Sequence, residues 1–345
     1  MKIKRNKTHY SGSLNRIRGF TIIEFLVASA LGIIVLIAVG SGYFTTQRLN
    51  DVALARLNVQ QDLRNASNLI VRDARMAGSF GCFSLANSDA TINSNDGAEP
   101  LTLSGGFAGV TGNQTSGVKL MRDPTVFNDI NGFQALASDT PVLLFQYGVG
   151  SASVTTGSGG ELTINQQSGD VLAHVNNNMP LIISSCLVLD RPSSFSVSGG
   201  NISNISPALS TAHNPGEMSI MKYAVNAYTL GQVAGATPGL YRFQLNDQGS
   251  WDGPELLIKD ITGINILFGY VNNCGTTTES FTFVEDPHTD PAAGQPALLH
   301  IRLLAEDGEQ ALVASAENGT TDSAGSLNIY NIDTTIRGGN VCADR

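Results

Sequence analysis

Residues 19–47 have the sequence GFTIIEFLVASALGIIVLIAVGSGYFTTQ, in which Glu24 is the last charged side chain. The 23 residues from Phe25 to Gln47 form an apolar run that could cross a bilayer, for which about 20 residues suffice. A carboxylate costs about 2.5–3.5 kcal/mol at the centre of a membrane helix. Glu24 therefore needs a functional explanation.

The segment before this run is basic. It contains six cationic side chains and no acidic one, at Lys2, Lys4, Arg5, Lys7, Arg16 and Arg18. Such a flank keeps the N-terminus on the cytoplasmic side of a membrane. A cleaved secretory signal would have a shorter apolar core and a small-residue cleavage site, which is not evident before Arg48. A plain single-span anchor would explain the length and the basic flank, but it would leave Glu24 unexplained.

Residues 18–28, RGFTIIEFLVA, closely resemble the prepilin cleavage and methylation motif of type IV pilins and type II secretion pseudopilins. The resemblance implies that a prepilin peptidase cleaves between Gly19 and Phe20 and that Phe20 is then N-methylated. Residues 1–19 would be a leader peptide that is removed, and the apolar helix would stay on the mature chain. Glu24 would pair with the N-terminal amine of a neighbouring subunit during assembly, where an opposite charge replaces water.

Apolar residues continue at three-to-four spacing beyond the apolar run, which predicts an amphipathic helix. They are Leu49, Val52, Leu57, Val59, Leu63, Ala66, Ile70 and Ala74. Gly78 is the expected C-cap. The sequence thus predicts one helix over residues 20–78, with its first half transmembrane and its C-terminal half packed on the chain's own sheet.

Beyond Gly78 the pattern changes to short apolar runs bounded by Gly, Asn, Asp and Ser, which is typical of β-strands. The clearest runs are 118–121, 142–147, 181–189, 222–229, 239–245, 264–270, 298–304 and 327–336. The polar stretches 87–106, 148–160, 192–214 and 284–294 are predicted to be loops. We therefore expect an α+β fold, in which a long N-terminal helix, apolar then amphipathic, packs on an antiparallel β-rich globular domain over residues 79–345.

The chain is acidic, with 20 Lys and Arg against 29 Asp and Glu and a net charge of −9. Removal of the leader would take away six positive charges and leave 14 − 29 = −15. A surface of this charge does not favour general nucleic-acid binding.

All four cysteines, Cys82, Cys186, Cys274 and Cys342, follow the predicted membrane helix. An even number of cysteines in an oxidising compartment suggests two disulfides, for which three connectivities are possible. We favour Cys82–Cys186 with Cys274–Cys342, because each bridge then staples one half of the domain. No CxxC pair is present, which disfavours zinc or thioredoxin-type chemistry.

A second resemblance narrows the family. Residues 73–82, DARMAGSFGC, resemble the helix-exit segment of PilW-type minor pilins, and residues 138–143, 239–243 and 256–270 fit the same family more loosely. Cys342, in the tail, is not a feature expected of every member, so the second disulfide is less secure than the first.

Catalytic patterns are weak. The histidines show no metal-binding spacing, and the sequence has neither a nucleophile elbow nor a phosphate-binding glycine loop. We expect no enzymatic activity, no cofactor and no metal site.

The resemblance implies a minor pilin that primes assembly of a type IV pilus and lies at or near its tip, supporting twitching motility, adhesion or DNA uptake. Its expected partners are other minor pilins, the major pilin, and the peptidase and methyltransferase that process it. Before assembly it would span the inner membrane once, with its N-terminus in the cytoplasm; afterwards it would belong to the periplasm and cell surface. A J-type pseudopilin of a type II secretion system is the nearest alternative, and a membrane-anchored periplasmic enzyme is a more distant one.

Overall fold

The computed structural model describes residues 19–84, 91–92, 117–156, 161–164, 175–177, 179–206, 208–211, 213, 216–273, 276–285, 296–305 and 329–336. One long helix, α1 (Ile22–Met76), precedes a β-rich region. The helix begins and ends within two residues of the predicted bounds. By its internal contacts the chain divides into a unit of residues 1–55 and a unit of residues 56–345. The predicted α+β class is therefore confirmed, and each unit is described by itself.

In the first unit, α1 exposes its apolar side chains. Ile22, Leu36 and Phe44 are each at least two-thirds exposed. The serine and threonine hydroxyls between Phe25 and Thr46 bond to carbonyls of their own helix, as in Ser41 to Ala38. Because these groups are satisfied internally, residues 25–46 present a mostly apolar surface.

In the second unit, the last turns of α1 bury one face. Val59, Ala66, Ile70 and Ala74 are all buried, at the three-to-four spacing of a helix face. The helix ends at Met76, and Gly78 follows with a φ of 76°, the left-handed conformation that glycine adopts just after a helix end. The Gly78 amide donates to the carbonyl of Gln146 at 2.9 Å, so the chain passes from the helix directly onto a strand.

A hairpin of β1 (Ser79–Phe80) and β2 (Phe83–Ser84) follows the helix. The twelve-stranded sheet then comprises β3 (Thr91–Ile92), β4 (Val118–Met121), β5 (Phe133–Ala135), β6 (Val142–Thr156), β7 (Leu162–Ile164), β8 (Leu181–Ser184), β9 (Val188–Asp190), β10 (Ser194–Ser198), β11 (Asn201–Ser206), β12 (Ser219–Val233), β13 (Gly239–Leu245) and β14 (Trp251–Lys259). The short 3-10 helices η1 (Pro124–Phe127) and η2 (Ile130–Gly132) connect β4 to β5.

β12 is the central strand of this sheet. It pairs with β6 and β5 along one edge and with β8 and β13 along the other, so that Asn226 lies opposite both Phe145 and Gln244. The path of paired strands runs β10-β11-β7-β6-β12-β8-β9-β3. Pairing among the described strands is antiparallel except between β3 and β9.

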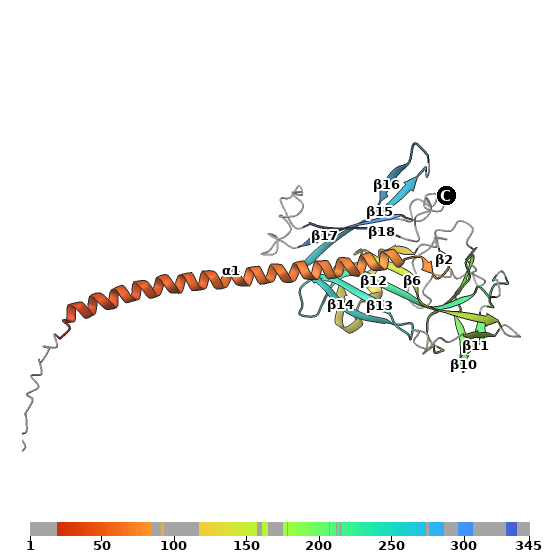
Figure 1. The fold of residues 1–345 in the computed structure, drawn as a ribbon, viewed down its shortest axis with the longest axis horizontal. Helices are drawn as coiled ribbons and strands as arrows, with labels where there is room; N and C mark the ends of the chain where they lie inside the picture. The colour runs from red at the N-terminus through yellow and green to blue at the C-terminus, as the bar shows by residue number, and fades with distance from the viewer. Residues whose placement is uncertain are drawn as a thin grey trace, which may run out of the picture. The chain divides into compact units, whose positions relative to one another are not determined.

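A four-stranded antiparallel sheet has the order β16-β15-β17-β18, from β15 (Ile261–Asn272), β16 (Ser280–Val284), β17 (Leu298–Ala305) and β18 (Ile329–Thr335). One apolar cluster joins α1, through Ala66, Ile70 and Ala74, to residues of both sheets such as Phe145 and Ile301. Figure 1 shows the end of α1 with β15, β17 and β18 on one side and β6, β12 and β13 on the other. The C-terminal part of the helix is thus a core element of the domain.

Candidate functional site

The N-terminal end of α1 carries the residues predicted to be processed. Gly19 and Phe20 are exposed, and Phe20 is 78% exposed. The Glu24 amide donates to Thr21 Oγ1 at 3.3 Å, while the Thr21 amide and hydroxyl donate to Glu24 Oε2 at 3.3 and 3.1 Å. This reciprocal arrangement is a capping box. The Thr-x-x-Glu spacing is present in the sequence and is the signal for this local role of Glu24, which was not among the predicted roles.

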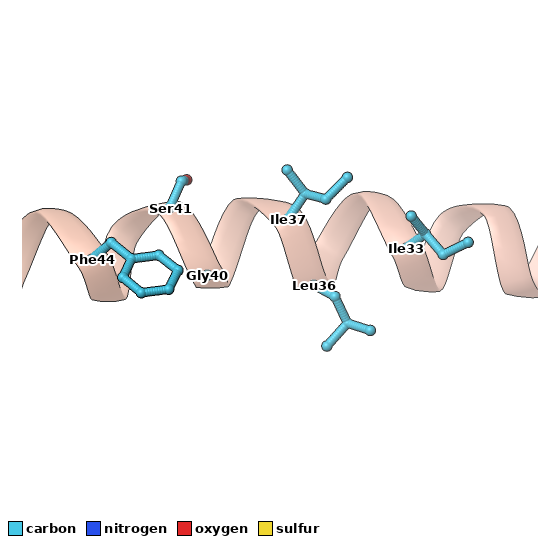
Figure 2. Close-up of a pocket in the computed structure, with 6 residues that line it drawn as sticks. All are labelled: Ile33, Leu36, Ile37, Gly40, Ser41 and Phe44. Atoms are coloured by element: carbon cyan, nitrogen blue, oxygen red, sulfur yellow. The ribbon is translucent and has the colours of Figure 1, made fainter.

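The apolar part of α1 is long and apolar enough to cross a membrane, by length and composition. Figure 2 shows Ile33, Leu36, Ile37 and Phe44 on successive turns around Gly40. No atom outside the local helix lies within 4 Å of where a Gly40 side chain would begin. The surface of α1 at Gly40, which has no side chain, is therefore a place where another helix or a lipid chain could approach closely.

A buried polar network surrounds Asp73, which has no solvent exposure. Its carboxylate accepts hydrogen bonds from Tyr147 of β6 at 3.0 Å, and from Asn226 and Tyr228 of β12 at 2.7 and 2.6 Å. Gln244 of β13 donates to the Asn226 side chain at 3.1 Å. Three donors on two strands thus hold one carboxylate of the helix, and this network ties α1 to the large sheet.

Two arginines lie near this carboxylate. Arg72 Nε is 3.6 Å from Asp73 Oδ1, with its side chain 58% exposed. Arg242 is buried and donates to Glu255 at 3.2 Å, while its Nε and Nη2 have no hydrogen-bond partner among the residues that the structure describes. Burial opposes the charge of Arg242, but its interactions with Tyr228, Asp73 and Glu255 outweigh burial and raise its pKa. Arg72 and Arg242 therefore both interact electrostatically with Asp73.

Three buried tyrosines have raised pKa values. Burial, followed by the charge of Asp73 and the hydrogen bond to it, raises the pKa of both Tyr147 and Tyr228 well above the usual range. Burial raises the pKa of Tyr223 to about 12, and its hydroxyl donates to Gln146. All three hydroxyls are therefore neutral donors at ordinary pH.

These shifts predict a loss of stability in alkaline solution. Unfolded tyrosines ionise near pH 10 and the folded ones do not, so above pH 10 the folded state binds more protons. Below about pH 10 these tyrosines should leave the free energy of unfolding unchanged. Above that pH, each of them should lower it by up to about 1.4 kcal/mol per pH unit. Urea unfolding in detergent between about pH 8 and about pH 11 measures this slope. Tyr228→Phe should reduce it, whereas Tyr43→Phe, at an exposed position, should not.

Cys82 and Cys186 form a disulfide, with their Cα atoms 4.6 Å apart. This is the pairing that the sequence analysis favoured for them. It joins the β1–β2 hairpin to the turn between β8 and β9, where Ser184 Oγ also donates to the Phe80 carbonyl at 2.9 Å. A bridge that closes a sequence separation of 104 residues contributes about 2–5 kcal/mol.

Cys274 and Cys342 lie outside the described residues, so their pairing stays a prediction. β15 and β18 both pair antiparallel with β17 and so run in the same direction. Both strands terminate at the same end of the small sheet, at Asn272 and Thr335, with β17 between them. A digest of unreduced protein should therefore yield one cross-linked peptide pair containing both cysteines. Thiol labelling of either cysteine in unreduced protein would contradict the pairing.

Ser185, His213 and Asp190 also lie together. His213 Nδ1 is 3.2 Å from Ser185 Oγ, and its Nε2 is 2.9 Å from Asp190 Oδ2. All three side chains are buried, and Asp190 also accepts the Ser210 amide at 2.7 Å. A nucleophile must reach its substrate, so we assign this enclosed group a structural role. Nowhere in the described ranges do three or more His, Cys, Asp or Glu side chains form a metal-binding group.

Comparison with protein-family models, curated proteins and solved structures finds no match for this chain.

Proposed function

We propose that this chain is a minor pilin that takes part in assembling a type IV pilus. The observation that carries the proposal is the motif from Gly19 to Glu24 at the start of an exposed apolar helix. That helix continues into the core of a β-rich domain, so one element joins a membrane-compatible surface to a folded body. The role is structural: the apolar half of α1 would first lie in the inner membrane and then pack among neighbouring subunits.

The fold supports this proposal in two further ways. The serine and threonine hydroxyls of the apolar segment are satisfied within the helix, so the segment suits either lipid or an apolar packing interface. The disulfide suits an oxidising compartment such as the periplasm. Among the described side chains, the buried polar groups around Asp73 tie the helix to the large sheet.

The proposal predicts a defined mature N-terminus. Mass spectrometry of pili sheared from cells should find this chain beginning at N-methylated Phe20. Gly19→Val, which adds a branched side chain at the proposed cleavage site, should leave the leader attached and remove the chain from the sheared fraction. A chain that keeps its leader in the wild type would overturn the proposal. A chain that is processed but supports protein secretion and not piliation would identify a pseudopilin instead.

A further inference from the structure

The last turns of α1 contact the domain largely through small side chains. Ala66, Ala74 and Ala77 are each no more than 1% exposed, as is the one large member of the buried set, Ile70. An alanine contributes a single methyl group, so the apolar area buried by this face is small for its length. Leu63, Val71 and Met76 are only partly buried against the same cluster. The hydrogen bonds of Asp73 add polar contacts to this apolar face.

The sheets keep much of their core without the helix. Within the described part of the chain, the apolar clusters around Phe243 and around Ile220 contain no residue of α1. The pairing of β12 with β6 and β13 is likewise independent of α1. Detachment of the helix end would expose one cluster and leave the other two intact.

The Asp73 network is suited to such detachment. Tyr147, Asn226 and Tyr228 converge on this single carboxylate from the two central strands. If the helix end leaves, Asp73 goes with it and the surface that it covered becomes open to water. Water can then hydrate the carboxylate and its three donors, which limits the cost of breaking the bonds.

The chain that follows α1 is attached to the domain by different contacts. The Gly78 amide bonds to Gln146, the Phe80 carbonyl accepts from Ser184, and Cys82 is covalently joined to Cys186. A Cβ on Gly117 would lie 2.1 Å from the Gly78 nitrogen, so two backbone segments are in direct contact here. Detachment that proceeds along α1 from its N-terminal side would reach this fixed point and stop.

We propose that α1 is attached to the domain in two stages. The hydrogen bonds of Asp73 are a contact that can be released, which we call the latch. The Cys82–Cys186 disulfide is a covalent limit to detachment, which we call the stop. When the helix is pulled, residues 63–76 detach from the sheets as one unit while the chain from Cys82 onward stays folded. The latch sets how readily the helix is released, and the disulfide sets how far the release extends. This inference rests on the fold and does not depend on the proposed function.

Hydrogen exchange of the full oxidised chain in detergent, read by mass spectrometry, tests both stages. The variants are Asp73→Asn, the pair Cys82→Ser with Cys186→Ser, and all three changes together. Tyr228→Phe, which removes one bond to Asp73, is a milder variant. Tyr223→Phe is its matched control, because Tyr223 is an equally buried tyrosine of β12 whose hydroxyl bonds to β6 and not to the helix.

Asp73→Asn should speed exchange across residues 63–76 by about tenfold or more, as expected for a local opening, while β6, β12 and residues 79–84 stay unchanged. Tyr228→Phe should give a smaller effect of the same pattern, and Tyr223→Phe none on the helix. The cysteine pair should speed exchange in residues 79–84, and the triple variant in both segments. If Asp73→Asn speeds hydrogen exchange equally in α1 and β12, or does not speed it in α1, the proposed latch is wrong. Faster exchange of residues 79–84 in oxidised Asp73→Asn would overturn the stop.

Discussion

Replacement of Asp73 by alanine is expected to lower the free energy of unfolding by about 3–5 kcal/mol, as when one partner of a buried charged network is removed. The change deletes a carboxylate without solvent exposure and leaves the hydroxyls of Tyr147 and Tyr228 without this acceptor. The Asn226 amide loses one of its two acceptors and keeps its bond to the Tyr147 hydroxyl at 2.7 Å. Each unsatisfied buried donor costs about 1–3 kcal/mol. The upper limit of this decrease in the free energy of unfolding is the free energy that docks the helix end onto the sheets, and the decrease can reach that limit.

Urea unfolding in detergent, followed through the near-ultraviolet signal of the domain, measures this change. Tyr228→Phe should cost about 1.5–3 kcal/mol, the range for a hydrogen bond to a charged group. Ala53→Gly, in the first unit and outside the buried face of α1, is a control for helix propensity alone and should cost no more than about 1 kcal/mol. Asp73→Ala with wild-type stability would show that apolar packing alone docks the helix.

The local sequence pattern was sufficient for strands whose apolar runs are bounded by turn residues. Residues 118–121 and 239–245 were predicted at the observed bounds of β4 and β13. The run 181–189 was predicted as one strand, but the structure divides it into β8 and β9. The division occurs at the turn that carries Cys186 and the half-exposed Leu187, where the disulfide fixes the chain. Apolar character alone could not mark that turn.

Three stretches that were predicted to be loops contain strands. Residues 148–160 include the second half of β6, residues 192–214 include β10 and β11, and residues 87–106 include the short strand β3. In the first stretch Ala152 and Val154 are buried in alternation with exposed residues. This period of two is present in the sequence, but glycine, serine and threonine obscure it. Pairing with β12 and β7 stabilises the strand where its own composition does not.

The polar network was only partly predictable. Asp73 lies three residues after Ile70 and four before Ala77, on the buried face of α1, and a carboxylate on such a face is a signal of a buried polar contact. Its donors follow at a sequence separation of 74 for Tyr147, 153 for Asn226 and 155 for Tyr228. No local pattern relates positions so far apart, because only the register of β6 against β12 brings them to one place.

Two explanations of Glu24 compete, and they predict different results for variants at this site. The carboxylate accepts from the Thr21 amide and hydroxyl in the capping box, which gives it a local role in a single chain. In the proposed pilus it would also neutralise the amine of a neighbouring Phe20. Glutamine can replace glutamate in a capping box but carries no charge. Glu24→Gln therefore removes the proposed pairing while it keeps the helix cap, and Thr21→Ala weakens the cap while it keeps the charge.

We expect Glu24→Gln to be inserted into the membrane and cleaved normally, and to be depleted from sheared pili by about tenfold or more, since loss of even 1.4 kcal/mol changes an equilibrium tenfold. Thr21→Ala should lower helix stability by about 1 kcal/mol and leave incorporation much less affected. Quantitative mass spectrometry of membrane and pilus fractions compares the two variants with wild type. If Glu24→Gln enters pili normally while Thr21→Ala does not, the capping box explains Glu24 and the intersubunit charge pair is excluded. The opposite result would show that the carboxylate is needed for its charge, because a chain with an intact cap would still fail to leave the membrane.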